Sequence, residues 1–133
     1  MKKSFVFIFL FLANASIYAQ NVEEKNNKVI GPSISWLDET SYDFSNVKKG
    51  SSVVATFEFL NNGSEVVIIS DAKGSCGCTS VKFPQQPILP GEKGTIKAIF
   101  NAQSIGNFYK TVTVTTNTKE STKVLNIKGI VVE

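Results

Sequence analysis

The sequence predicts an all-β protein, an immunoglobulin-like antiparallel β-sandwich of seven or eight strands. Three observations lead to this prediction. Apolar and polar residues alternate with a period of two from residue 33 onward, turn residues recur roughly every 8–12 residues, and no window has the apolar spacing of a helix. Because a lone hairpin is only marginally stable, two such sheets must face each other to bury their Val, Ile and Phe side chains.

The first strands are expected between residues 33 and 60. Residues 33–37 form a short strand that carries Trp36, the only tryptophan, and residues 40–44 are expected to continue it. Residues 51–60 alternate more regularly, with mostly polar side chains on the outer face. The inner face of this strand is formed by Val53, Ala55, Phe57 and Phe59.

The middle of the predicted sandwich begins with a turn. Residues 61–63 read Asn-Asn-Gly, and both residue types tolerate the positive φ of tight hairpin turns. Residues 65–71 form the next strand, with Val67 and Ile69 facing inward. A short strand follows at residues 79–83.

Prolines mark the loop that precedes the last strands. Pro84, Pro87 and Pro90 lack the backbone donor that a central strand needs, so this stretch is predicted to lie outside the sheets. The remaining strands are residues 94–100, 107–116 and 122–132. Their inward side chains are Ile96, Ala98, Phe100, Phe108, Val112, Val114, Leu125, Ile127 and Val131.

The N-terminus has the pattern of an export signal. Lysines, an apolar run and small residues up to Ala19 predict a cleavable signal peptide at residues 1–19. The apolar run is shorter than the roughly 20 residues that span a bilayer, and no membrane insertion is expected after the signal is removed. Residues 20–32 are predicted as a flexible leader and residues 33–133 as one domain. The mature protein is therefore expected to be extracytoplasmic, either periplasmic or secreted.

The composition argues against nucleic-acid binding and against enzymatic function. All 14 basic residues are lysines, and the chain contains no histidine. Arginine provides the bidentate contacts to phosphate and guanine, so its absence disfavours a nucleic-acid site. Loss of Lys2 and Lys3 with the signal brings the net charge of +3 close to neutrality. No Ser-His-Asp or Cys-His set is possible, and we expect a protein that is not an enzyme.

The only two cysteines, Cys76 and Cys78, lie in a Cys-Gly-Cys-Thr tetrapeptide. Residues i and i+2 of a strand are about 6.6 Å apart, whereas disulfides prefer Cα separations of about 5.5–6 Å. A bond between them therefore needs a bend, for which Gly77 provides the freedom. Closing so small a ring contributes roughly 1.6 kcal/mol by the loop-entropy relation, against about 3 kcal/mol for a 15-residue loop. The pair is not expected to staple the fold.

Three interpretations of Cys76 and Cys78 remain open. They form a local disulfide, or are two small buried residues, that shapes the connection after the preceding strand. Alternatively they bind Cu(I), which accepts few, soft ligands, whereas zinc would need four and the mature chain has neither His nor Met to complete the set. In the third interpretation they exchange disulfides, with Lys73 and Lys82 favouring the thiolate if they lie near.

Several motifs between Phe57 and the C-terminus resemble one bacterial family. They are Phe57-x-Phe59-x-Asn61-x-Gly63, Ser75-Cys76-Gly77-Cys78-Thr79, Pro87-Ile88-x-Pro90-Gly91-Glu92-x-Gly94, Gly106-x-Phe108-x-Lys110, Thr116-Asn117 and Ile127-x-Gly129. Over residues 40–133 the pattern is similar to the family known as domain of unknown function 1573, a relative of PapD, major-sperm-protein and Hydin-type immunoglobulin-like modules. The resemblance implies the sandwich fold and export from a bacterial cytoplasm, and it implies no activity.

The function expected from these observations is that of an exported, non-enzymatic binding or assembly module. Its partner would be a protein or glycan of the cell envelope, bound by strand addition at a sheet edge or by the end loops. The alternative function is Cu(I) binding or thiol redox chemistry at Cys76 and Cys78, with Cu(I) as the only cofactor considered.

Overall fold

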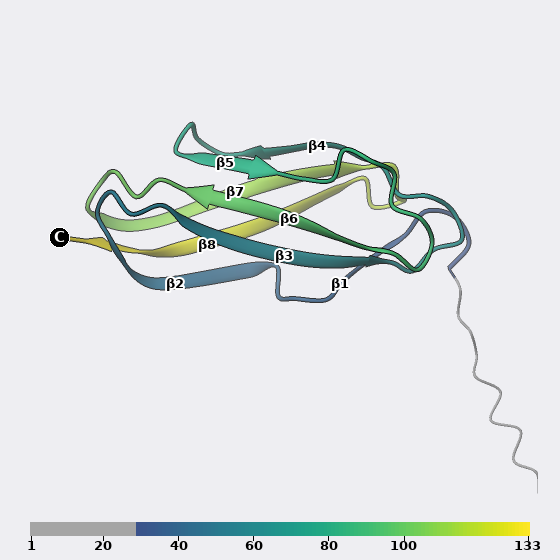
Figure 1. Ribbon diagram of the computed structural model, residues 1–133, viewed down its shortest axis with the longest axis horizontal. Helices are drawn as coiled ribbons and strands as arrows, with labels where there is room; N and C mark the ends of the chain where they lie inside the picture. Colours follow the sequence, from purple (N-terminus) through teal and green to yellow (C-terminus); the bar gives the residue numbers. More distant parts are fainter. Residues whose placement is uncertain (1–28) are drawn as a thin grey trace, which may run out of the picture.

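The computed structural model describes residues 29–133, which form eight β-strands in two sheets packed face to face (Figure 1). The predicted all-β immunoglobulin-like sandwich is confirmed. The predicted signal peptide, residues 1–19, and residues 20–28 of the predicted leader lie outside the described residues. Residues 29–133 contain no helix that is long and apolar enough to cross a bilayer.

Each sheet contains four strands. In sequence order they are β1 (Ile34–Trp36), β2 (Ser41–Lys48), β3 (Val53–Asn61), β4 (Ile69–Gly74), β5 (Thr79–Lys82), β6 (Lys93–Phe100), β7 (Gly106–Thr116) and β8 (Thr122–Val132). The first sheet has the order β1-β3-β6-β5 and the second has the order β2-β8-β7-β4. All neighbours are antiparallel except β2 and β8, which pair in parallel from Ser41 opposite Asn126 to Lys48 opposite Val132.

Residues 40–44 do not continue the first strand, and this expectation was wrong. The chain changes sheets between Trp36 and Ser41, so that β1 is an edge of the first sheet and β2 an edge of the second. The N–H of Leu37 still donates to Glu58 O of β3 at 2.9 Å, whereas Thr40 O already accepts from Asn126 N of β8 at 2.8 Å. Alternation did not reveal the switch because it reports which side chains are buried and not which strand lies alongside.

The predicted inner faces form the core. All the side chains predicted to face inward are buried except Val53, which is half-buried and packs against the core. Val67 is fully buried but precedes β4, and its only pairing is an isolated bridge to Ile88. The predicted strand at residues 65–71 therefore starts too early, because residues 62–68 carry the chain from the first sheet to the second.

The Asn-Asn-Gly segment is not a tight hairpin, and its φ angles were predicted wrongly. None of residues 61–63 is among the residues with positive φ. Asn61 instead ends β3 with a fully buried side chain, which donates to Glu65 O and Ile88 O at 2.8 Å each and accepts from Gly63 N at 3.0 Å. This amide joins the connection at residues 62–68 to the loop that precedes β6.

Residues 29–32, the last of the predicted leader, lie against this connection. Val29 forms a parallel bridge with Gly63, Gly31 N donates to Ser64 Oγ at 2.8 Å, and Ser64 N donates to Gly31 O at 3.0 Å. A Cβ atom on Gly63 would collide with the carbonyl oxygen of Gly31. The close approach of two backbones, and not a positive φ, therefore requires glycine at position 63.

Candidate functional site

The cysteines lie in the turn between β4 and β5, where the chain passes from the second sheet to the first. This turn is at the end of the sandwich that also carries the C-terminus (Figure 1). Backbone hydrogen bonds fix both of its arms. Ser75 N donates to Thr111 O of β7 at 2.8 Å, and Asn101 N, just after β6, donates to Cys78 O at 3.1 Å. The motif is thus anchored to a central strand of each sheet.

Cys76 and Cys78 form a disulfide in the structure, with their Cα atoms 5.3 Å apart. The backbone bends as this bond requires, and Thr79 N donates to Cys76 O at 3.3 Å. The Thr79 hydroxyl lies 3.8 Å from the sulfur of Cys76 and 3.9 Å from that of Cys78. The disulfide is one of the interpretations left open by the sequence, whereas Cu(I) binding by these two residues stays a prediction.

Gly77 has a different role from the one expected. Its φ lies outside the range that favours glycine, and a Cβ atom built on it meets nothing within 4 Å. Both cysteines are half-buried and Gly77 is exposed. The bend between the cysteines therefore does not need glycine, and the tip of the turn is open to solvent.

The surroundings of the disulfide combine the edge of the core with polar side chains. Cys78 packs against the core and borders a hollow of about 200 Å³, whose walls include Phe100 and Phe108. These two rings stack with centroids 4.1 Å apart. Lys73 and Lys82, the predicted modulators of the thiols, lie exposed on β4 and β5, which flank the turn. Among the described residues, no three Cys, Asp or Glu side chains gather as a metal site, so the two sulfurs would be the donors.

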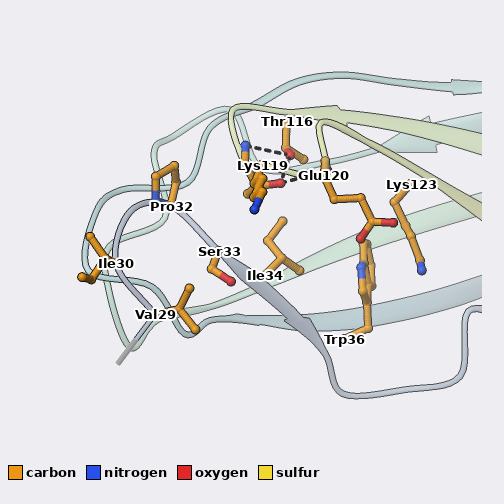
Figure 2. A pocket seen from close by; sticks show the side chains of 11 residues that line it. Val29, Ile30, Pro32, Ser33, Ile34, Trp36, Thr116, Lys119, Glu120 and Lys123 are labelled. Atoms are coloured by element: carbon orange, nitrogen blue, oxygen red, sulfur yellow. Dashed lines mark hydrogen bonds between the residues drawn. The ribbon is translucent and has the colours of Figure 1, made fainter. Parts of the chain in front are cut away.

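A second candidate site, which the sequence analysis missed, is a pocket between β1 and the β7–β8 turn. Its volume is about 550 Å³. Figure 2 shows Ile34 and Trp36 extending from one side and Glu120 and Lys123 from the other, so that the two sets face each other across the pocket. The only sequence signal was the apolar Trp36 in a very short strand, and that signal did not indicate what lies opposite.

The pocket lies beside a strand edge that no other strand of the described part of the chain covers. β8 begins at Thr122, but its pairing with β2 begins only at Asn126. On its other side, β8 pairs with β7 from Thr122 onward. Within residues 29–133, residues 122–125 therefore have a partner strand on one side only, as a consequence of the sheet switch between β1 and β2.

Fold and sites together define a small immunoglobulin-like β-sandwich module with one local disulfide and, besides the edge strands of its two sheets, a stretch of β8 that β2 leaves unpaired within residues 29–133. The family model described as Protein of unknown function (DUF1573) matches residues 35–131, and the protein belongs to this family. The resemblance expected from the sequence motifs is confirmed. No curated protein matches the sequence significantly.

Solved structures with the same fold are remote in sequence. A protein of unknown function from Porphyromonas gingivalis W83 is 12% identical with a TM-score of 0.66, over 84% of this chain and 51% of that one. The PapD-like domain 7 of human CEP192 is 12% identical with a TM-score of 0.60, over 75% of this chain and 85% of that one. The YadV chaperone is 12% identical with a TM-score of 0.53, over 77% of this chain and 52% of that one. The chain thus spans about half of the bacterial protein and of the chaperone, and the likeness shows the fold alone.

Proposed function

We propose that the protein is an exported, non-enzymatic binding or assembly module that holds a protein or glycan of the bacterial cell envelope. The observation that carries this proposal is the uncovered edge of β8 beside the pocket under Ile34 and Trp36. Unpaired backbone groups at a sheet edge are the usual means by which immunoglobulin-like modules accept an added strand. The fold likeness to PapD-like domains and to a chaperone supports such a role.

A non-enzymatic role is supported by the composition. The chain lacks histidine, and its two cysteines are bonded to each other in the structure. General acid–base and nucleophilic catalysis usually depend on such groups in a free state. The sandwich offers an open surface, sheet edges and loops, which are the features through which binding proteins contact their partners.

Affinity capture tests the proposal directly. The mature chain, tagged at its C-terminus, is incubated with a solubilised envelope extract of its own bacterium, and an unrelated tagged immunoglobulin-like domain serves as control. We expect a protein or glycan that only the mature chain retains and that the untagged protein displaces. If nothing is retained above the control, the binding function is contradicted.

The second candidate function, redox chemistry or Cu(I) binding, is favoured by one observation. The Cys76–Cys78 disulfide is half-buried at an exposed turn and is therefore reachable. A dithiol reductant would supply two electrons and two protons, be oxidised to its own disulfide and leave two thiols. Cu(I) could then displace both thiol protons. Intact-mass measurement tests the Cu(I) part: one copper retained by the reduced protein and none by the oxidised form supports Cu(I) binding, and copper in neither contradicts it.

A further inference from the structure

We propose that the first residues of β8 are a docking edge for an extended segment of another protein that carries an acidic side chain over Lys123. The inference rests on the proposed binding function and names the binding edge and the chemistry of the partner. The docked segment would lie end to end with β2, in the plane of the second sheet. Residues 122–125 offer it an edge of about 13 Å, at about 3.3 Å per residue.

Backbone geometry shows which groups are free along this edge. In a strand, the N–H and C=O of alternate residues point to opposite sides. Asn126 N donates to Thr40 O, on the side of β2, so the backbone of Val124 points to the same side. The neighbouring strand gives the same result. Thr111 N donates to Ser75 Oγ and Thr111 O accepts from Ser75 N, just after β4, so the backbone of Thr111 points away from β8. Thr113, which lies opposite Val124, points the same way. Val124 therefore presents a backbone donor and acceptor to an incoming strand.

The pocket provides the apolar part of the contact. Ile34 and Trp36 are on the inner face of β1 and are only partly buried, although both pack against the core. The opposite sheet does not cover them, because β2 begins only at Ser41. A strand added to β8 would place its inward side chains over these two residues (Figure 2). It would thereby complete the sandwich at this corner.

The charge of the pocket selects the partner. Odd-numbered residues of β8 face inward, as the buried Leu125 and Ile127 show, so Lys123 occupies an inward position and is half-buried. Neither Lys123 nor Lys119, which also lines the pocket, takes part in the ion pairs found between residues 29 and 133. With Glu120, the rim carries one net positive charge. A carboxylate on the incoming strand would offset the cost of covering Lys123.

The same charges disfavour a second copy of this chain. Antiparallel pairing of two β8 edges about a two-fold axis would bring Lys123 close to its own symmetry mate. Like charges placed across a strand pair are destabilising. An inward lysine on an open edge is also a common protection against edge-to-edge aggregation. The geometry therefore favours a different protein with an acidic residue.

Hydrogen exchange of the mature protein tests the edge first. The amide of Val124 should exchange roughly 100-fold faster than that of Leu125, whose N–H faces β7. Equal protection of the two amides in the free protein would overturn the proposal. Removal of residues 20–28 should leave the Val124 rate unchanged, whereas a faster rate would mean that this segment of the chain itself occupies the edge, which also contradicts the proposal.

Peptide binding tests the chemistry, with Trp36 as the fluorescent reporter because the chain has no other tryptophan. The probe is an eight-residue peptide of alternating Ile and Thr with one central Asp. Replacing Asp by Lys should weaken binding roughly five- to tenfold, and Lys123→Glu should reverse that preference. Val124→Pro removes the free edge donor without removing a hydrogen bond to β7, so it should abolish binding while circular dichroism stays native. Absence of Asp-peptide binding, or binding that survives Val124→Pro, would overturn the proposal.

Two further outcomes separate this inference from the proposed function. If Val124→Pro still captures the envelope partner, the module binds elsewhere, so the edge assignment fails and the binding function stands. If sedimentation shows a dimer that Val124→Pro dissociates, the occupant is a second copy, and the acidic partner is excluded. A partner that the mature chain captures and Val124→Pro loses supports both.

Discussion

The ring of Phe59 lies directly over Gly94, its cross-strand partner on β6. Phe108 and Gly129 repeat this relationship on β7 and β8, in the other sheet. In each pair the missing Cβ makes room for an aromatic ring that would otherwise be pushed into the opposite sheet. Each glycine thus weakens its own strand but lets a large side chain fill the core at high packing density.

Gly94→Ala should therefore destabilise the fold by about 1–3 kcal/mol, the usual cost of overpacking a core. The new methyl would overlap the Phe59 ring, whose Cε atoms would be 2.9 Å away. Urea unfolding followed by Trp36 fluorescence measures the loss, since the Trp36 ring is 5.4 Å from that of Phe59. In the double variant Gly94→Ala/Phe59→Leu the smaller side chain relieves the overlap. The double variant should therefore lose less stability than the sum of the losses in the two single variants. Simple additivity would contradict the explanation.

Asn61→Ala should cost about 2–4 kcal/mol, because it leaves the carbonyls of Glu65 and Ile88 without their donor and the N–H of Gly63 without its acceptor. Asn61→Asp should cost at least as much, since a carboxylate cannot donate to two carbonyl oxygens. Urea unfolding checks both variants.

The matched control is the adjacent Asn62→Ala. The side-chain oxygen of Asn62 is buried without a hydrogen-bond partner, so its removal leaves no new group unsatisfied. We expect a change within about 0.5 kcal/mol. Equal losses at positions 61 and 62 would show that the hydrogen-bond network at Asn61 does not hold the loops together.

Much of the fold followed from side-chain alternation. Phe57, Ile96 and Leu125 are buried as predicted, because their strands expose one face to water and bury the other. The sheet switch before β2 and its parallel pairing with β8 did not follow. Backbone hydrogen-bonding groups are the same in every residue except proline, so the alternation of side chains does not show which strands pair.

The candidate sites also include features that the sequence predicts and features that it does not. The position of Cys76 and Cys78 in a bend between strands could be predicted, since two residues at this spacing can bond only across a bend. The open edge at Val124 could not be predicted, because it exists only where β2 fails to cover β8. The buried role of Asn61 was hidden by its sequence context, which is also that of a common turn.

Gly77→Ala should be tolerated and should keep the disulfide. The added Cβ meets no atom within 4 Å, and the φ angle of Gly77 is one that other residues adopt. Alanine also restricts the unfolded chain, so we expect unchanged stability or a gain of up to about 1 kcal/mol. Intact-mass measurement with and without reductant shows whether the disulfide is formed, and urea unfolding measures the stability. A free-thiol product would show that the bend depends on glycine.

Replacing both cysteines, Cys76→Ser with Cys78→Ser, should leave the fold intact and cost at most about 2 kcal/mol. The three-residue ring constrains the unfolded chain by only roughly 1.6 kcal/mol, and the arms of the turn stay bonded through Ser75 and Asn101. The expected result is a native circular dichroism spectrum and a cooperative urea transition at a slightly lower midpoint. Cys76→Ser alone is the control, because it also breaks the bond but leaves one thiol, and it should lose the same stability. If the double variant fails to fold, the disulfide holds more of the structure than its ring size allows, and the turn would have to be regarded as part of the core, with Phe100 and Phe108 depending on it.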